Sequence, residues 1–149
     1  MKLFLDTNFI MEFVEQRKQF DKVSLVLDSI FAKKNEAYIS TGCIYTLAFL
    51  FEQNLKRQNI HRPEMTIRLR SYLAEVLNMA KMVELSHAGA ERAVYSEAFT
   101  DIEDSFQYQC AVENRCDVLI TINIDDFRKA DQRRLEILTP TQFVEKYLS

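Results

Sequence analysis

Glycine, proline and cysteine are scarce in this chain of 149 residues, which contains two glycines, two prolines and three cysteines. Because Gly42 and Gly89 stand alone, neither of the common glycine-rich loops that cradle phosphates is present, and nucleotide-binding folds built on those loops are excluded. The cysteines are odd in number and lack the paired C-x-x-C spacing of zinc sites. We therefore expect reduced, buried thiols rather than disulfides or a bound zinc ion.

Long apolar runs are missing as well. No stretch approaches the roughly 20 apolar residues that cross a bilayer, and the N-terminus starts directly in a strand-like segment without a basic and apolar leader. Hydrophobic residues nevertheless make up 48% of the chain, enough for a sizeable buried core. These features predict one domain spanning residues 1–149, a cytoplasmic location and no membrane partner.

The formal net charge is −3, yet basic side chains are in excess within residues 56–70. We call these five residues the basic patch: Lys56, Arg57, Arg62, Arg68 and Arg70. Such a patch can neutralise the phosphates of RNA, although a solvated helix face has the same composition. RNA binding by the basic patch is therefore one of two interpretations that the sequence leaves open.

Apolar periodicity divides the chain into alternating short strands and helices. Strands are expected at residues 2–5, 37–39, 82–85, 118–122 and 135–138. Helices are expected at residues 8–17, 20–34, 43–55, 64–80, 88–98 and 101–115, with a last helix beginning at 139–142. The β-branched, unalternating run at 118–122 is typical of a strand buried on both faces. This order predicts an α/β fold with a central parallel sheet of about five strands and helices on both faces.

Carboxylates and other polar groups recur where the predicted strands end or where a helix begins. These residues are Asp6, Ser40, Asp101, Glu103, Asp104, Asn123, Asp125 and Asp126. In open α/β sheets, ligands bind at the carboxyl ends of the strands, so we expect the acids to converge into one pocket. Carboxylates packed without basic partners repel one another, and hard oxygen ligands favour magnesium or manganese. The pattern predicts a divalent cation that activates water for attack on a phosphate.

Helix capping offers a simpler explanation for each of these acids taken singly. Asp6 and Asn8 are good N-caps for the next helix, and Thr100 with Glu103 has the spacing of a capping box. Asp125 and Asp126 can simply begin a short surface helix. Capping does not explain why the acids recur at the same edge of one sheet.

Three segments together resemble a known family. LFLDTNFI at the N-terminus, DIEDSFQYQCA in the late helix and LITINIDDF after the fourth strand look like the PIN-domain fold, and specifically like compact bacterial toxin-type proteins called VapC-like. The resemblance covers essentially the whole chain. It implies a PIN-like fold and a Mg²⁺- or Mn²⁺-dependent ribonuclease, homodimeric and encoded with a cognate antitoxin that inhibits it.

The resemblance assigns metal-site roles to particular acids. Asp6 matches the first metal-binding acid of the family and Asp104 the third. The fourth position falls on Asn123, with Asp126 as a possible substitute, and Asp101 matches an accessory acid. The expected catalytic residues are thus Asp6, Asp101, Asp104 and Asn123, and the expected metal ligands are Asp6, Asp104 and Asp126.

Supporting roles follow from the same resemblance. Thr7 and Asn8 match the hydroxyl and amide that orient the first acid, and Thr121 matches a helper threonine. Glu103 and Asp125 add carboxylates at neighbouring positions. Together these residues would surround the metal-binding acids.

The chain departs from the family pattern at the second acid. Family members commonly carry a glutamate about six residues after the serine that ends the second strand, and here that position is Thr46. Glu52 lies six residues further on and is rotated by about 240° on the helix, which makes it a poor substitute. An alternative function is therefore a degenerate, non-catalytic PIN domain that binds RNA or protein.

A different enzyme class also begins with an apolar strand ending in aspartate. A phosphatase with an aspartyl nucleophile would carry a second aspartate two positions on, where this chain has Asn8, and it would need a lysine loop that is not evident. For the homodimer, apolar helix faces supply a possible seam that can equally pack within one monomer. Those residues are Ile44, Leu47, Phe51, Leu69, Leu73 and Val76.

Overall fold

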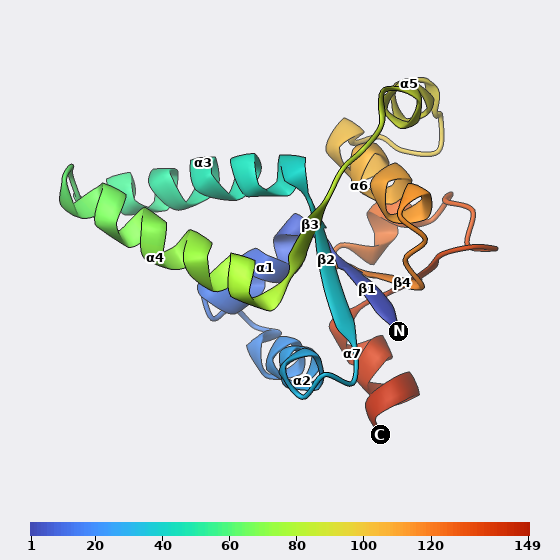
Figure 1. Cartoon of the computed structure of the whole chain (residues 1–149), viewed down its shortest axis with the longest axis horizontal. Coiled ribbons are helices and arrows are strands. Elements are labelled where there is room, and N and C mark those ends of the chain that lie inside the picture. Colours follow the sequence, from blue (N-terminus) through green and yellow to red (C-terminus); the bar gives the residue numbers. More distant parts are fainter.

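A computed structural model describes all residues, 1–149, and is built around one five-stranded sheet (Figure 1). The strands are β1 (Lys2–Leu5), β2 (Glu36–Ser40), β3 (Lys81–Val83), β4 (Val118–Ile120) and β5 (Glu136–Leu138). They are ordered β3-β2-β1-β4-β5, and every pair of neighbours is parallel. The chain therefore extends the sheet on one side of β1 first and then returns to build the other side.

Alternate residues of the strands face opposite sides of the sheet, and each side has its own core. On one face, Leu3 and Leu5 belong to a cluster of 20 buried residues. On the other face, Phe4 belongs to a cluster of 8 buried residues that includes Leu119 and Ile137. Because both faces are buried, the strands read as unbroken apolar runs. The predicted α/β fold with helices on both faces is confirmed.

Seven α-helices and two other helical segments cover the sheet. They are α1 (Thr7–Val14), α2 (Phe20–Phe31), α3 (Thr41–Arg57), α4 (Glu64–Met79), α5 (His87–Tyr95), α6 (Ile102–Glu113), the 3₁₀-helix η1 (Ile124–Phe127), α7 (Pro140–Phe143) and the π-helical turn η2 (Val144–Leu148). The larger core joins β1 to α1, α2, α3, α4 and α7, and the smaller core joins it to α6. Figure 1 shows α3 and α4 as a hairpin that extends away from the sheet.

Helix α1 ends earlier than the sequence predicts. The expected helix over 8–17 stops at Val14, because the chain leaves the helix in a Schellman motif. The nitrogen of Arg17 donates to the carbonyl of Glu12 at 3.0 Å, and that of Gln16 donates to Phe13 at 3.2 Å. Gln16 adopts a left-handed φ of 48°, a position that glycine usually fills. Without glycine there, the sequence carries no signal for the end of the helix.

The start of α6 also differs from its prediction. The N-cap is Asp101, whose side chain accepts a hydrogen bond from the Glu103 nitrogen at 2.8 Å, and the helix begins at Ile102. The capping box expected from Thr100 does not form. The Glu103 side chain is instead free to reach Thr7 across the site.

The apolar residues considered as a dimer seam pack within the chain. Leu47, Phe51 and Val76 are buried in the larger core, and Ile44, Leu69 and Leu73 pack against it. The Phe51 and Tyr72 rings lie 5.5 Å apart and join α3 to α4. These residues therefore hold the hairpin together, and for the buried Leu47, Phe51 and Val76 the structure favours packing within one monomer over a dimer seam.

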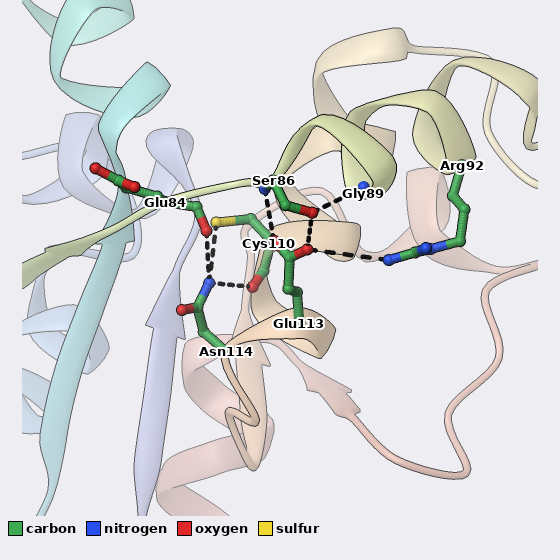
Figure 2. A network of polar contacts seen from close by, with 7 residues as sticks. All are labelled: Glu84, Ser86, Gly89, Arg92, Cys110, Glu113 and Asn114. Atoms are coloured by element: carbon green, nitrogen blue, oxygen red, sulfur yellow. Dashed lines mark hydrogen bonds and ion pairs between the residues drawn. The ribbon is translucent and has the colours of Figure 1, made fainter.

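A polar network fixes α5 against the C-terminal half of α6 (Figure 2). The Ser86 nitrogen donates to Glu113 Oε2 at 2.7 Å, and the Ser86 hydroxyl donates to the other Glu113 oxygen. Asn114 Nδ2 donates to the Glu84 carbonyl at 2.9 Å. A Cβ at Gly89 would lie 2.9 Å from Glu113 Oε1, so glycine permits this close approach. The network sets the position of α6, which carries acids at its opposite end.

The three cysteines are placed as the sequence predicts. Cys43, Cys110 and Cys116 are buried and unpaired, as expected for reduced thiols. Burial raises the pKa of the Cys43 thiol to about 12, which keeps it protonated. No helix is long and apolar enough to cross a lipid bilayer.

Candidate metal and phosphate site

The carboxyl ends of β1 and β4 meet at the point where the strand order reverses. Leu5 of β1 pairs with Ile120 of β4, so the residues that follow, Asp6 and Thr121, lie side by side. The later strands β2 and β3 lie on one side of β1, and β4 and β5 lie on the other. Such a switch point is where open α/β sheets bind ligands.

Asp6 is buried at this point, and both of its carboxylate oxygens accept hydrogen bonds. Its Oδ1 accepts from the Thr7 nitrogen at 2.9 Å and from Gln107 Nε2 at 3.3 Å, while its Oδ2 accepts from the Thr121 hydroxyl at 2.8 Å. Burial raises the pKa of the Asp6 carboxyl, and hydrogen bonds from Thr121 and Gln107 oppose that shift. Asp6 is also the N-cap of α1, so capping and membership of the site are compatible.

Asn8 ties the end of β4 to α1. Its Oδ1 accepts from the Ile122 nitrogen at 3.0 Å, and its Nδ2 donates to the Thr121 hydroxyl oxygen at 3.3 Å. The Asn123 nitrogen also donates to that oxygen, at 3.2 Å. With these two donors on its oxygen, Thr121 directs its own proton to Asp6. The expected orienting groups thus form one connected network.

Gln107 is a site residue that the sequence analysis missed. Besides Asp6, its Nε2 donates to the Thr7 hydroxyl at 3.3 Å, and its Oε1 accepts from the Ser40 hydroxyl at 2.6 Å. It therefore connects the ends of β1 and β2 to α6. The available signal was its spacing, because residues three and four positions after Asp104 and Glu103 lie on the same helix face.

Of this network, Asp6, Thr7 and Asn8 border a cavity of about 380 Å³, which we call the strand-end cavity. Its lining residues are Asp6, Thr7, Asn8, Met11, Arg17, Thr46, Leu50, Asp101, Glu103 and Asp104. Two larger cavities, of about 470 and 620 Å³, contain neither Asp6 nor Asp104. The strand-end cavity is thus where the predicted acids of two distant segments come together.

Three predicted residues after β4 lie outside the cavity lining. The side chains of Asn123, Asp125 and Asp126 are exposed. Asp125 and Asp126 lie on η1, which is the short surface helix expected if these two acids only start a helix. Asp126 still influences Asp104 through its charge. The lining therefore includes Thr46 at the position of the second family acid but does not include Asn123 at the fourth.

Asp104 shows how crowded with negative charge the cavity is. Burial and the charges of nearby carboxylates, Asp6 first, raise the pKa of the half-buried Asp104 to about 7. A carboxylate in this state is a good acceptor for a cation, because a cation removes the repulsion that favours the proton.

The donor set suits a hard cation that keeps part of its water shell. No three His, Cys, Asp or Glu side chains converge closely enough to form a complete metal site. Magnesium commonly binds one or two carboxylates and takes its other ligands from water and phosphate. Asp6 and Asp104 would hold such an ion, with Asp101 and Glu103 adding charge at the rim.

No residue of the basic patch lines this cavity. Helix α3 borders the cavity at Thr46 and Leu50, whereas Lys56 and Arg57 are in its last turn, roughly 9 to 16 Å further along the helix axis. Arg62 and Arg68 form exposed ion pairs with Glu52 and Glu64 within the hairpin. RNA binding by the basic patch stays a prediction.

The five-stranded parallel sheet with helices around it is the fold of a PIN domain. The PIN domain family model matches residues 2–125, so the chain belongs to this family. The family resemblance seen in the three sequence segments is thereby confirmed.

Particular relatives are similar over nearly the whole chain. Ribonuclease VapC1 of Aquifex aeolicus (strain VF5) is 24% identical over 151 residues, which cover 98% of this chain and 95% of that protein. Two crystal structures share the fold. A chain of VapBC2 from Rickettsia felis bound to a promoter DNA fragment is 18% identical, with a TM-score of 0.67 over 93% of this chain and 98% of that one. A chain of DNA-bound VapBC from Salmonella typhimurium is 13% identical, with a TM-score of 0.63 over 94% and 98%.

The raised pKa of Asp104 predicts how the metal-free protein responds to pH. Its carboxyl holds a proton to about pH 7 in the folded state and only to its ordinary value of 3.8 when unfolded. As pH rises from about 4 to 7, the unfolded state releases this proton first and stability falls; above about 7 the effect is constant. In chelator, the parent should therefore lose melting temperature across this range more steeply than Asp104→Asn. If the melting temperatures of the two proteins changed equally with pH, the raised pKa of Asp104 would be contradicted.

Proposed function

We propose that this protein is a Mg²⁺- or Mn²⁺-dependent ribonuclease and the toxin of a toxin–antitoxin pair. The proposal treats residues 1–149 as a single PIN-like domain that hydrolyses RNA phosphodiester bonds. The observation that carries it is the pairing of buried Asp6 with Asp104 in one cavity that lacks enough positive charge of its own. The family membership and the similarity to a VapC ribonuclease support it.

Some residues of the site bind the cation, and others hold its carboxylate ligands in position. Asp6 and Asp104 bind the cation, and a bound cation polarises a phosphate and makes a bound water more acidic. Thr121, Gln107 and the Thr7 nitrogen fix both oxygens of Asp6, so this carboxylate needs no rearrangement on binding. Such pre-organisation favours the transition state, because the ligand geometry is set in advance.

Partners follow from the relatives. The two similar crystal structures are VapBC assemblies bound to DNA, which supports a cognate antitoxin as the protein partner of this chain. We also propose a homodimer and a cytoplasmic location. With the buried seam residues excluded, the exposed apolar side chains available for protein contacts include Tyr45, Phe49 and Tyr95.

A non-catalytic PIN domain is the second candidate, and Thr46 is the observation that favours it. Thr46 lines the strand-end cavity but offers a neutral hydroxyl where family members commonly place a carboxylate. A site with fewer acids binds a divalent cation less tightly. In this case the chain would bind RNA or protein at the same surface without cutting RNA.

A cleavage assay with purified protein separates the two functions. A labelled single-stranded RNA should be cut in the presence of Mn²⁺ or Mg²⁺, and an excess of chelator should stop the reaction, because Asp6 and Asp104 then carry no ion. Readdition of Mn²⁺ should restore it. RNA binding without cleavage at millimolar Mn²⁺ would support the non-catalytic domain instead.

A further inference from the structure

Arg17 is the one basic residue that borders the strand-end cavity. It follows the left-handed Gln16 at the end of α1, and its backbone is fixed on both sides. The Arg17 nitrogen donates to the Glu12 carbonyl, and its own carbonyl accepts from the Phe20 nitrogen, both at 3.0 Å. The Schellman motif thus sets where this side chain starts.

The guanidinium of Arg17 is held by Glu15 and keeps N–H groups that make no hydrogen bond. Nε and Nη2 donate to Glu15 Oε2 at 2.9 and 2.6 Å, which uses two of its five N–H groups. Glu15 is its only ion-pair partner within 4.0 Å, and the side chain is 48% exposed. Arg17 therefore forms no ion pair with the acids of the cavity, although it borders the same space.

The charge of the cavity lining suggests what this arginine does. Phosphoryl transfer is favoured by positive charge around the reacting phosphate, and metal ions and cationic side chains can both supply that charge. Here Thr46 is neutral and Asn123 lies outside the lining, so the acids suffice for a single ion. A guanidinium suits the remaining task, because its planar set of donors matches two phosphate oxygens.

We propose that Arg17 is a catalytic residue that donates to the non-bridging oxygens of the scissile phosphate and replaces the charge of a second metal ion. The inference rests on the proposed ribonuclease function. In the hydrolysis, the oxygen of water bonds to phosphorus, the bond to the leaving ribose oxygen breaks, and that oxygen gains the proton that water loses. Arg17 stays protonated throughout and exchanges no proton.

Matched variants test this role in single-turnover cleavage. Arg17→Gln should slow cleavage by about 10²- to 10³-fold, the usual effect of losing one donor to a transition-state oxyanion. Arg17→Lys should lose less, because it keeps the charge but not the paired donors. Lys18→Gln is the control, since Lys18 is exposed in the same turn and does not line the cavity. Cleavage by Arg17→Gln within tenfold of Lys18→Gln would overturn the proposal.

Two titrations test the proposal without RNA. Calorimetry should find one Mn²⁺ per chain in the parent, and Arg17→Gln should bind Mn²⁺ at least as tightly, because a nearby positive charge has been removed. With Mn²⁺ bound, inorganic phosphate should bind the parent and Lys18→Gln about tenfold more tightly than Arg17→Gln. Two Mn²⁺ ions per chain, or equal phosphate affinity in all three proteins, would overturn it. If the parent cuts no RNA, the ribonuclease function fails, and these titrations still decide whether Arg17 binds phosphate.

Discussion

Replacing Asp6 by asparagine should nearly abolish RNA cleavage. The change keeps the shape of the side chain but removes the charge that binds the cation, and Asp6 is the most deeply buried acid of the cavity. Even groups that only orient a metal ligand are worth about 10- to 100-fold in affinity or activity, so we expect a loss of about a thousandfold or more. Single-turnover cleavage at saturating Mn²⁺ measures it.

The same variant should fold normally, which makes a loss of activity interpretable. The asparagine side chain would keep an oxygen for Thr7 and Gln107. The Thr121 hydroxyl can turn its proton to Asn8 Oδ1, 3.4 Å away, and accept from the new amide in place of Asn8 Nδ2. Because burial raises the pKa of Asp6, the charged carboxylate costs stability at neutral pH, and the variant should melt no lower than the parent in chelator. Asp28→Asn, at an exposed position of α2, is the control. Turnover of Asp6→Asn within tenfold of that control would reject the assignment.

Restoring the missing acid should strengthen metal binding. Thr46 lines the cavity with Asp6 and Asp104, so Thr46→Glu offers a hard ion a charged ligand in place of a hydroxyl or water. We expect Mn²⁺ affinity to rise about tenfold, or ~1.4 kcal/mol. Cleavage at limiting Mn²⁺ should rise with it.

Melting with and without metal gives this variant a distinct signature. In chelator, Thr46→Glu should melt below the parent, because another carboxylate joins an already crowded cavity. Mn²⁺ should then raise its melting temperature by more than it raises that of the parent, since a ligand of the folded state stabilises it. Gln53→Glu, seven residues further along nearly the same face of α3, is the control, as it lies outside the lining. A Thr46→Glu protein that melts identically in chelator and Mn²⁺ would favour the non-catalytic function.

The parts of the site that could be predicted from sequence are those fixed by strand ends. Asp6 follows a short apolar run, and parallel strands bring the positions after their carboxyl ends to one edge whatever the intervening chain does. Thr121 was expected inside a strand over 118–122 and took its role from the family resemblance, whereas β4 ends at Ile120 and leaves Thr121 beside Asp6. Asp104 was one of several acids expected in the pocket, and only the family resemblance singled it out as a metal ligand, because its distance from Asp6 depends on how α6 docks. The position of α6 is set by contacts such as that between Ser86 and Glu113, which the local sequence pattern does not predict.

Gln107 and Arg17 escaped prediction for different physical reasons. Gln107 lies on a helix whose polar and apolar residues both face protein, so periodicity did not separate it from surface glutamines. Arg17 was assigned to a helix that ends three residues earlier, at Val14. Its place at the cavity depends on Gln16 adopting a conformation that non-glycine residues seldom take. The hydrogen bonds of Gln107 and the end of α1 both depend on tertiary packing, which the local sequence does not show.

The α3–α4 hairpin allows its tip to change in evolution without changes at the strand-end cavity. Its base borders the strand-end cavity at Thr46 and Leu50, while its tip, around residues 56–63, extends away from the sheet (Figure 1). Insertions or deletions of whole helical turns at that tip leave the strand ends, and hence the acids, where they are. Relatives can therefore diverge in hairpin length and tip composition, and acquire different surfaces, while they inherit an unchanged site.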